Sequence, residues 1–249
     1  MKAFANIVLI AVMAVAFTIL CALGFWQLQR LEWKEAMIER VEQGLSSPSV
    51  PLSEIEAMMQ AGTDIEYRPV TTELRYLHDG EQHYFATHKS QPGFFIYTPA
   101  ELRDGRRLFV NRGFVPMELK EQSRREAGLT KGWLTIKGLA RTAPAEKPNT
   151  FVPNNDLAKN VYHWKSLSQM AGNAYDKMVY DTVGFFLDAD DTPVPGEWPV
   201  GGVTRISFPN SHLQYAFTWF GLAAALLGVG GYFLFSRRRI RVKDREAIA

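Results

Sequence analysis

The chain has 249 residues, of which 47% are hydrophobic and 22% are charged, and its formal net charge at pH 7 is +2. These averages suit an ordinary soluble protein, but residues 4–23 and 217–235 form two apolar stretches without any charge. Each stretch can cross a bilayer as a helix, which requires about 20 apolar residues. This pattern excludes a purely cytosolic enzyme. It also excludes a multi-span transporter, because no other part of the chain is as long and apolar.

The two apolar stretches divide the chain into four parts. We expect a first transmembrane helix over residues 1–24, an outer domain over 25–211, a second transmembrane helix over 212–236 and a basic tail over 237–249. The first stretch predicts an uncleaved anchor, because no pair of small residues suited to a signal peptidase lies where the apolar run ends.

Basic residues predict the orientation of these helices. The tail contains six of them: Arg237, Arg238, Arg239, Arg241, Lys243 and Arg245. Lys and Arg residues near a span stay on the cytoplasmic side, so both termini are expected in the cytoplasm and the outer domain in the periplasm. Arg30 and Lys34 follow the first span and oppose this orientation, but the tail outnumbers them. The apolar run begins almost at Met1, which disfavours an Arg-rich organelle presequence and favours a bacterial inner membrane.

Charge and cysteine content limit the chemistry of the outer domain. Without the tail and Lys2, 21 of the 28 basic and 24 of the 26 acidic residues remain, a balance of −3. This balance gives no electrostatic footprint for nucleic acid. Cys21 is the only cysteine and lies in the first span, so the outer domain has no disulfide, no thiolate nucleophile and no cysteine-based metal site. It is expected to fold around an apolar core alone, which its size permits.

Two helices are expected before the strands. Residues 25–43 have apolar positions near helical spacing and continue the first span as a helix. Residues 52–61 form a second, short helix, for which Ser53 is a plausible N-cap with Glu56 three residues later.

Strand signals dominate the rest of the outer domain. Alternating or β-rich segments predict strands over residues 66–77, 82–89, 93–98, 106–115 and 132–140. The dipeptide Asp79-Gly80 predicts a hairpin between the first two. A loop over 142–156, a helix near 165–172, a mixed segment over 175–187, a connection over 188–202 and a last strand over 203–208 follow. The fold class is therefore an α+β membrane protein with a mainly antiparallel β domain, either a barrel or a sandwich, and a few helices.

The histidines of the expected hairpin do not predict a metal site. If Asp79-Gly80 is the turn, His83 faces Tyr76 and His88 faces Thr71. These two histidines are an odd number of residues apart and so lie on opposite faces of a strand. Together with His78, they are better explained as surface or rim residues. The acidic residues at 188–191 lack the glycine and the terminal glutamate of a calcium loop and predict a solvated loop.

Aromatic and polar residues lie at the outer ends of both spans. The first group contains Trp26, Arg30 and Trp33 on one helical face, with Gln27 and Lys34 adjacent, and the second contains His212, Tyr215 and Trp219. One explanation is an aromatic belt with snorkelling cations at the bilayer interface. The other is an aromatic-walled cleft between two helix ends, with an imidazole and a guanidinium directed inward.

Such a cleft has the chemistry that haem requires. His212 would ligate the iron, the aromatic rings would pack on the macrocycle, and Arg30 or Lys34 would pair with propionates. Asn210 or Ser211 can cap the second helix and place His212 in its first turn, where the helix dipole favours the neutral imidazole. The candidate cofactor-binding residues are His212, Tyr215, Trp219, Trp26, Arg30, Trp33 and Lys34, with His212 as the ligand of haem iron.

An ordered set of motifs resembles the surfeit locus protein family. The set comprises Gly24, Trp26, Gln27, Arg30, Trp33 and Lys34, then Tyr97-Thr98-Pro99, then the stretch Val110–Pro116, and finally the stretch Asn210–Trp219. The resemblance extends in order from residue 4 to residue 235 and includes both spans. Two positions depart from the family pattern: Phe114 replaces a tryptophan, and Ser166, after Trp164, stands near an expected acidic residue.

The resemblance implies a function that is not enzymatic. It implies an assembly factor for a haem-copper terminal oxidase of the cytochrome c oxidase type, which assists the delivery of haem, expected to be haem a, to the catalytic subunit. The expected partners are that subunit, the lipid membrane and a haem-synthesis enzyme. No catalytic residue is assigned. Two alternatives stay open: a haem-free scaffold that binds oxidase subunits, and a periplasmic sensor or enzyme.

Two further expectations concern packing. In the middle motif, Gly113 is expected to adopt a positive φ at a turn, Pro116 to terminate strand pairing, and Arg112 to be exposed or paired locally. In the second span, the small residues Gly221, Ala224, Ala225 and Gly228 predict the face that packs against the first span.

Overall fold

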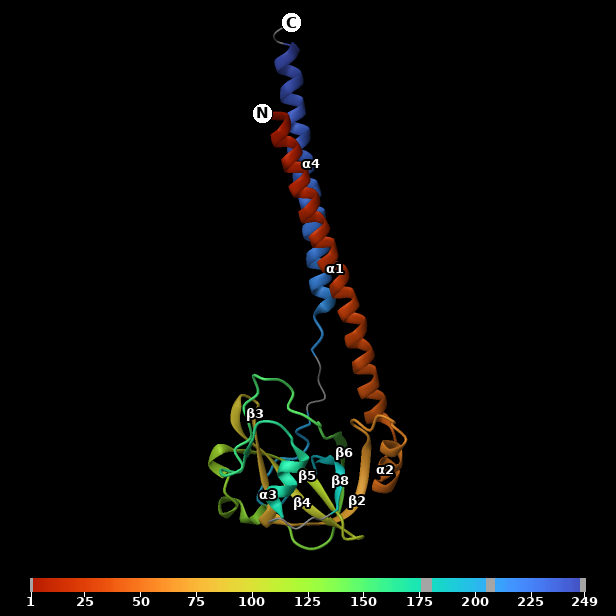
Figure 1. Cartoon of the computed structure of the whole chain (residues 1–249), viewed down its shortest axis with the longest axis vertical. Helices are drawn as coiled ribbons and strands as arrows, with labels where there is room; N and C mark the ends of the chain where they lie inside the picture. Colours follow the sequence, from red (N-terminus) through yellow and green to blue (C-terminus); the bar gives the residue numbers. More distant parts are fainter. Residues whose placement is uncertain (1, 176–180, 205–208, 247–249) are drawn as a thin grey trace. The chain divides into compact units, whose positions relative to one another are not determined.

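The computed structural model describes the backbone of residues 2–175, 181–204 and 209–246, and their side chains except those of residues 2, 3, 5 and 237–246. The chain forms two compact units (Figure 1). The helical unit consists of Met1–Arg40 and Ser207–Ala249, and the barrel unit consists of Val41–Ile206.

The helical unit contains the two long helices of the chain, α1 (Lys2–Ser46) and α4 (His212–Glu246). Within them, Asn6–Ser46 and His212–Ser236 are long and apolar enough to cross a membrane, as judged by length and composition. The expected first span and the helix expected over 25–43 are thus one continuous helix. Their junction contains no proline and no cluster of turn residues that would end it.

α1 and α4 pack along a seam with a seven-residue repeat on α4. Ala216, Ala223 and Gly230 are buried there. A Cβ atom added to Gly230 would lie 1.7 Å from the Met13 Cε atom, so the glycine lets the flexible Met13 side chain lie close against α4. A seven-residue spacing keeps one stripe of a helix against its neighbour.

The prediction that the small-residue face of the second span packs against the first span is wrong. Gly221, Ala224, Ala225 and Gly228 are exposed. The position of the seam follows from a bulky side chain: Phe220 lies over Gly24 of α1, where an added Cβ would lie 2.6 Å from the Phe220 ring. The phenyl ring fits only where the facing helix has no side chain.

In its described residues, the barrel unit contains eight strands and two helices. In chain order they are β1 (Val50–Pro51), α2 (Leu52–Gln60), β2 (Pro69–Tyr76), β3 (Gln82–His88), β4 (Gln91–Leu102), β5 (Arg107–Pro116), β6 (Leu134–Thr142), β7 (Val161–Tyr162), α3 (Leu167–Ala174) and β8 (Thr182–Ala189). Short 3-10 turns follow β2 and connect β5 to β6.

Five of the strands close into a barrel. The strand order is β1-β2-β6-β8-β5-β4-β3-β7, and an additional pairing of β2 with β4 completes the ring β2-β6-β8-β5-β4. All pairs in this ring are antiparallel except β5 with β8. Numbered along the chain, the ring reads 1-2-3-5-4-1 with strands 3 and 5 parallel, which is the topology of an OB-fold barrel. Of the two architectures expected from the sequence, the barrel is confirmed.

The prediction of a hairpin at Asp79-Gly80 is wrong. These residues form a 3-10 turn over His78–Gly80, and β3 pairs with β4 and β7 rather than with β2. His83 therefore lies opposite Ile96, and His88 lies opposite Gln91. The physical reason is that β2 already uses its edges to pair with β4 and β6, so β3 extends the sheet beyond β4.

Other boundaries differ from expectation. β4 continues past Pro99 to Leu102, and the mixed segment over 175–187 contains most of β8. The N-cap of α2 is Pro51, with no side-chain hydrogen bond, and not Ser53. Of the strand expected over 203–208, residues 203 and 204 form no strand, and 205–208 lie outside the described residues.

The barrel is filled mainly by aliphatic side chains. Its interior cluster includes Val70, Leu74, Leu108, Val110, Phe185 and Leu187. Leu52 and Ile55 of α2 join the same cluster, and Glu56 of α2 forms an ion pair with Arg106 in the turn between β4 and β5. α2 therefore covers the end of the barrel at which β5 and β8 begin.

A second, aromatic cluster lies outside the barrel on β5 and β8. Tyr97, Phe109, Tyr162, Met170 and Phe186 are buried in it. Phe109 and Phe186 also occupy neighbouring positions of the parallel pair, with ring centroids 6.4 Å apart. α3 covers this cluster through Met170.

Gly113 adopts the expected positive φ, +121°, but in β5 and not at a turn. A Cβ atom at this position would lie 1.9 Å from the Val200 carbonyl oxygen. The neighbouring residue, Phe114, exchanges two backbone hydrogen bonds with Val200, of 2.9 and 3.0 Å. The glycine thus allows a return segment to pair with β5. Pro116 is the last paired residue of β5, as expected.

A buried ionic network fixes the turn after β2 to the connection between β5 and β6. The side chains of Glu81 and Arg125 are each only 1% exposed and form a bidentate ion pair. His83 Nε2 lies 2.9 Å from Glu81 Oε1. Burial raises the pKa of Glu81, but the hydrogen bonds from His83 and Arg125 outweigh it and leave the pKa below its ordinary value.

Candidate functional site

His212 begins α4 and is held from two directions. Its backbone N–H donates to Asn210 Oδ1 at 3.3 Å, so Asn210, one of the two residues expected to cap the helix, satisfies an N–H group at its start. Its ring Nδ1 atom lies 2.7 Å from Oε1 of Gln27, a residue of α1 that is only 8% exposed. A carboxamide oxygen only accepts hydrogen bonds, so Nδ1 carries the proton and donates. The lone pair of the neutral ring then lies on Nε2.

This arrangement suits a metal ligand. Histidines that bind metals generally donate their second N–H to a carbonyl or carboxylate, which fixes the ring orientation and the tautomer. Gln27 supplies such a carbonyl to His212. The sequence placed Gln27 beside the candidate face but assigned it no role.

The aromatic residues of α4 accompany His212. Trp219 is half-buried, and its indole Nε1 is buried without a hydrogen-bond partner among the described residues. Tyr215 is exposed. Trp219 lies seven residues after His212 and so on the same stripe of the helix, with Tyr215 beside it.

The candidate residues of α1 do not meet His212 in the way the sequence suggested. Trp26 and Trp33 are about half exposed, and the Arg30 guanidinium lies over the Trp33 ring, 4.5 Å from its centroid. Lys34 is half-buried. By helix geometry, Trp26, Arg30 and Trp33 are all rotated to one side of Gln27. The structure therefore brings together Gln27 and His212, with this aromatic and basic face beside them.

The described histidines of the barrel unit form no metal site. His78 Nε2 lies 2.8 Å from the Thr130 carbonyl, His83 contacts Glu81, and the His88 ring lies 5.2 Å from that of Phe114. Among the described residues, no group of three His, Cys, Asp or Glu side chains is placed to hold a metal ion.

The two positions that depart from the family pattern have structural roles. Ser166 is the N-cap of α3, and its hydroxyl accepts the Gln169 backbone N–H. Phe114 is buried in β5 and packs edge-on against Phe95. Both residues therefore serve local packing in the barrel unit.

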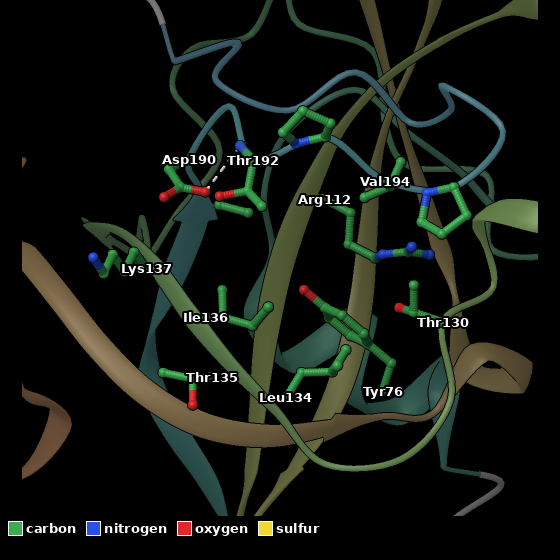
Figure 2. Close-up of a pocket in the computed structure, with 13 residues that line it drawn as sticks. Tyr76, Arg112, Thr130, Leu134, Thr135, Ile136, Lys137, Asp190, Thr192 and Val194 are labelled. Atoms are coloured by element: carbon green, nitrogen blue, oxygen red, sulfur yellow. Dashed lines mark hydrogen bonds between the residues drawn. The ribbon is translucent and has the colours of Figure 1, made fainter.

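Arg112 is a residue whose position the sequence did not predict. It was expected to be exposed or paired locally, but it is only 3% exposed and lines a cavity at the end of the barrel (Figure 2). The pattern contained a signal: Arg112 is two residues after Val110 and four after Leu108, both of which point into the barrel.

Comparisons with known proteins agree with the motifs. The model of the SURF1 family matches residues 14–224. Surfeit locus protein 1 from Xenopus tropicalis is 33% identical over 222 residues, which cover 82% of this chain and 68% of the frog protein. The protein of that name from Gallus gallus is 34% identical, covering 85% and 70%, and the one from Homo sapiens is 32% identical, covering 82% and 70%. The chain therefore belongs to the SURF1 family, whose members are known in general as assembly factors for cytochrome oxidase.

Proposed function

We propose that this chain is a membrane-anchored assembly factor that assists the delivery of haem to the catalytic subunit of a haem-copper terminal oxidase. The observation that supports it is the hydrogen bond between His212 Nδ1 and Gln27 Oε1, which leaves Nε2 of a half-buried imidazole with its lone pair. Haem, expected to be haem a, would be the cargo of this protein and not a resident catalyst.

The residues at this helix border would supply the groups that a haem carrier requires. His212 would supply an axial ligand. Trp219 and Tyr215 would offer ring surfaces to the macrocycle, with Trp26 and Trp33 on the neighbouring face of α1. Arg30 and Lys34 would pair with propionates, for which a guanidinium is well suited. The partners would be the oxidase catalytic subunit and a haem-synthesis enzyme.

A second candidate is a scaffold that binds oxidase subunits without haem. The same hydrogen bond favours it in one respect, because a partly buried pair of polar side chains also fixes the register of two apolar helices. In that case His212 and Gln27 are structural and the exposed aromatic residues contact oxidase subunits.

One absorption experiment separates the two candidates. The full chain is purified in mild detergent from haem-replete bacterial membranes, as wild type and as the His212→Ala, Gln27→Leu and Gln214→Ala variants. Gln214 is the matched control, since it is an exposed residue of α4 two positions from His212. Haem delivery predicts a Soret band in the wild type and the control, loss of the band in His212→Ala, and haem affinity about 10- to 100-fold weaker in Gln27→Leu.

Two results would contradict the delivery of haem through His212. A full haem spectrum in His212→Ala would exclude axial ligation by this residue. A wild type without bound haem, in cells whose oxidase still requires the protein, would favour the scaffold. Arg30→Ala should weaken haem binding less than His212→Ala, because an ion pair at a wet interface contributes little and Lys34 remains.

We further propose that the protein lies in a bacterial inner membrane with both termini in the cytoplasm and the barrel unit in the periplasm. The six basic residues of the tail support this orientation. A reporter that is active only in the periplasm should work when inserted in the exposed loop at 149–151 and fail when fused after Arg239. The opposite pattern would reverse the topology.

A further inference from the structure

The end of the barrel opposite α2 contains a pocket. β2 and β8 end there, β6 begins there, and β5 passes it at Arg112; the cavity volume is about 370 Å³. Its lining includes Tyr76, Arg112, Leu134, Ile136, Asp190 and Val194 (Figure 2). Small-molecule sites usually have volumes of about 300–1,000 Å³ and often lie in the mouths of barrels.

The pocket contains a buried cation, Arg112, for which the described residues supply no counter-ion. Arg112 is 3% exposed, and among the described residues no carboxylate lies within ion-pair distance of it. Its guanidinium donates to the Gly128 carbonyl, contacts His78 Nδ1 at 3.4 Å and lies 4.7 Å from the centroid of the Tyr76 ring. Together with a hydrogen bond to the Tyr76 side chain, these contacts use three of its five N–H groups.

The neighbours of Arg112 do not neutralise it. His78 Nε2 lies 2.8 Å from the Thr130 carbonyl, which can only accept, so Nε2 carries the proton and Nδ1 accepts from Arg112. Burial lowers the pKa of His78, in agreement with this neutral tautomer. Glu81 contributes a distant attraction, but its oxygens are already bound by Arg125 and His83. Because a buried charge without a partner is costly, an anion at this position would stabilise the site.

The walls of the pocket limit the kind of anion. Leu134, Ile136 and Val194 line it together with Pro193 and Pro195 and give it an apolar surface. Asp190 lies at its edge with its carboxylate accepting the Thr192 N–H at 3.1 Å, and in Figure 2 the Lys137 ammonium points away from the centre. A ligand with a second negative charge would therefore lie near the Asp190 carboxylate, and the Lys137 ammonium would not point toward it.

We infer that this pocket binds a small organic monocarboxylate, whose carboxylate pairs with Arg112 and whose apolar body lies against Leu134, Ile136 and the proline-containing wall. Tyr76 contributes its ring beside the guanidinium. The pocket lies in the barrel unit and includes none of the residues proposed to hold haem.

The test uses a ligand and its neutral isostere. The full chain in lipid nanodiscs is titrated calorimetrically with 1-naphthoate and with 1-naphthamide, which has the same aromatic body without the charge. Wild type is expected to bind the carboxylate at least about tenfold more tightly than the amide, the ratio that a charge-assisted hydrogen bond provides. Arg112→Gln should remove this preference. Arg103→Gln, a matched control on an exposed arginine, should retain it.

A second variant keeps the inference testable if Arg112→Gln fails to fold. Val194→Trp fills the pocket from a loop outside the barrel strands and should abolish naphthoate binding while leaving circular dichroism unchanged. Three results would overturn the inference: equal affinity for naphthoate and naphthamide, wild-type naphthoate affinity in a folded Arg112→Gln or Val194→Trp protein, or no naphthoate binding by the wild type at millimolar concentration.

Discussion

Replacing Glu81 with glutamine should destabilise the barrel unit far more than the same change at an exposed glutamate. The substitution preserves shape but leaves Arg125, whose side chain is 1% exposed, without its carboxylate. Removal of one partner from a buried ion pair costs about 3–5 kcal/mol. Glu73 provides the matched control, because its ion pair with Arg103 is 54–57% exposed and such pairs contribute about 0–1 kcal/mol.

Urea unfolding of the detergent-solubilised full chain, followed by near-ultraviolet circular dichroism, measures both costs. With a slope of about 2 kcal/mol per molar urea, Glu81→Gln should lower the unfolding midpoint by about 1.5–2.5 M, and Glu73→Gln by less than about 0.5 M. Equal midpoints for the two variants would refute the reasoning. They would mean that the network around Glu81 contributes no more than a surface ion pair.

Three further outcomes follow from the described contacts. The pKa of Glu81 is lowered in the folded protein, so its ionised carboxylate stabilises the fold fully above the ordinary pKa of 4.5. This stabilisation is lost as the pH falls through the folded-state pKa. Wild type should therefore lose more stability on acidification than Glu81→Gln. Gly113→Ala should prevent accumulation of folded protein, since its Cβ would overlap a carbonyl oxygen. Ala223→Leu should reduce disulfide crosslinking between cysteines placed at Met13 and Gly230, whereas Ala225→Leu on the exposed face should not.

The elements that the sequence predicted correctly are those with a strong local pattern. Both long helices and the strands β2, β3, β5 and β6 lie close to their expected ranges. The pairing of β2 with β3 was predicted wrongly because a turn dipeptide reports only local geometry. β4 was expected to end before Pro99, which lacks an N–H, yet the Pro99 carbonyl still accepts from Leu77 at 2.8 Å and the strand continues.

In the candidate site, too, features set by neighbouring residues were predictable, and contacts between residues distant in the sequence were not. The helix start at His212 follows from the Asn210 cap and was predictable. Spacing along α1 indicates which residues share a face, but not which face meets α4, so the partnership of Gln27 with His212 was missed. Arg112 was missed for another reason: an arginine is usually exposed, and that expectation was given more weight than the alternation that places it in line with Val110.

The position of β8 in the barrel has a consequence for the growing chain. Among the described residues β8 is the last strand along the chain, yet it lies between β5 and β6 and pairs with both. Until residue 189 has been synthesised, the ring cannot close, and β5 and β6 each present an unpaired edge open to proteases and to other chains. A truncation anywhere upstream of β8 should therefore yield a chain prone to degradation or aggregation, and not a smaller working domain.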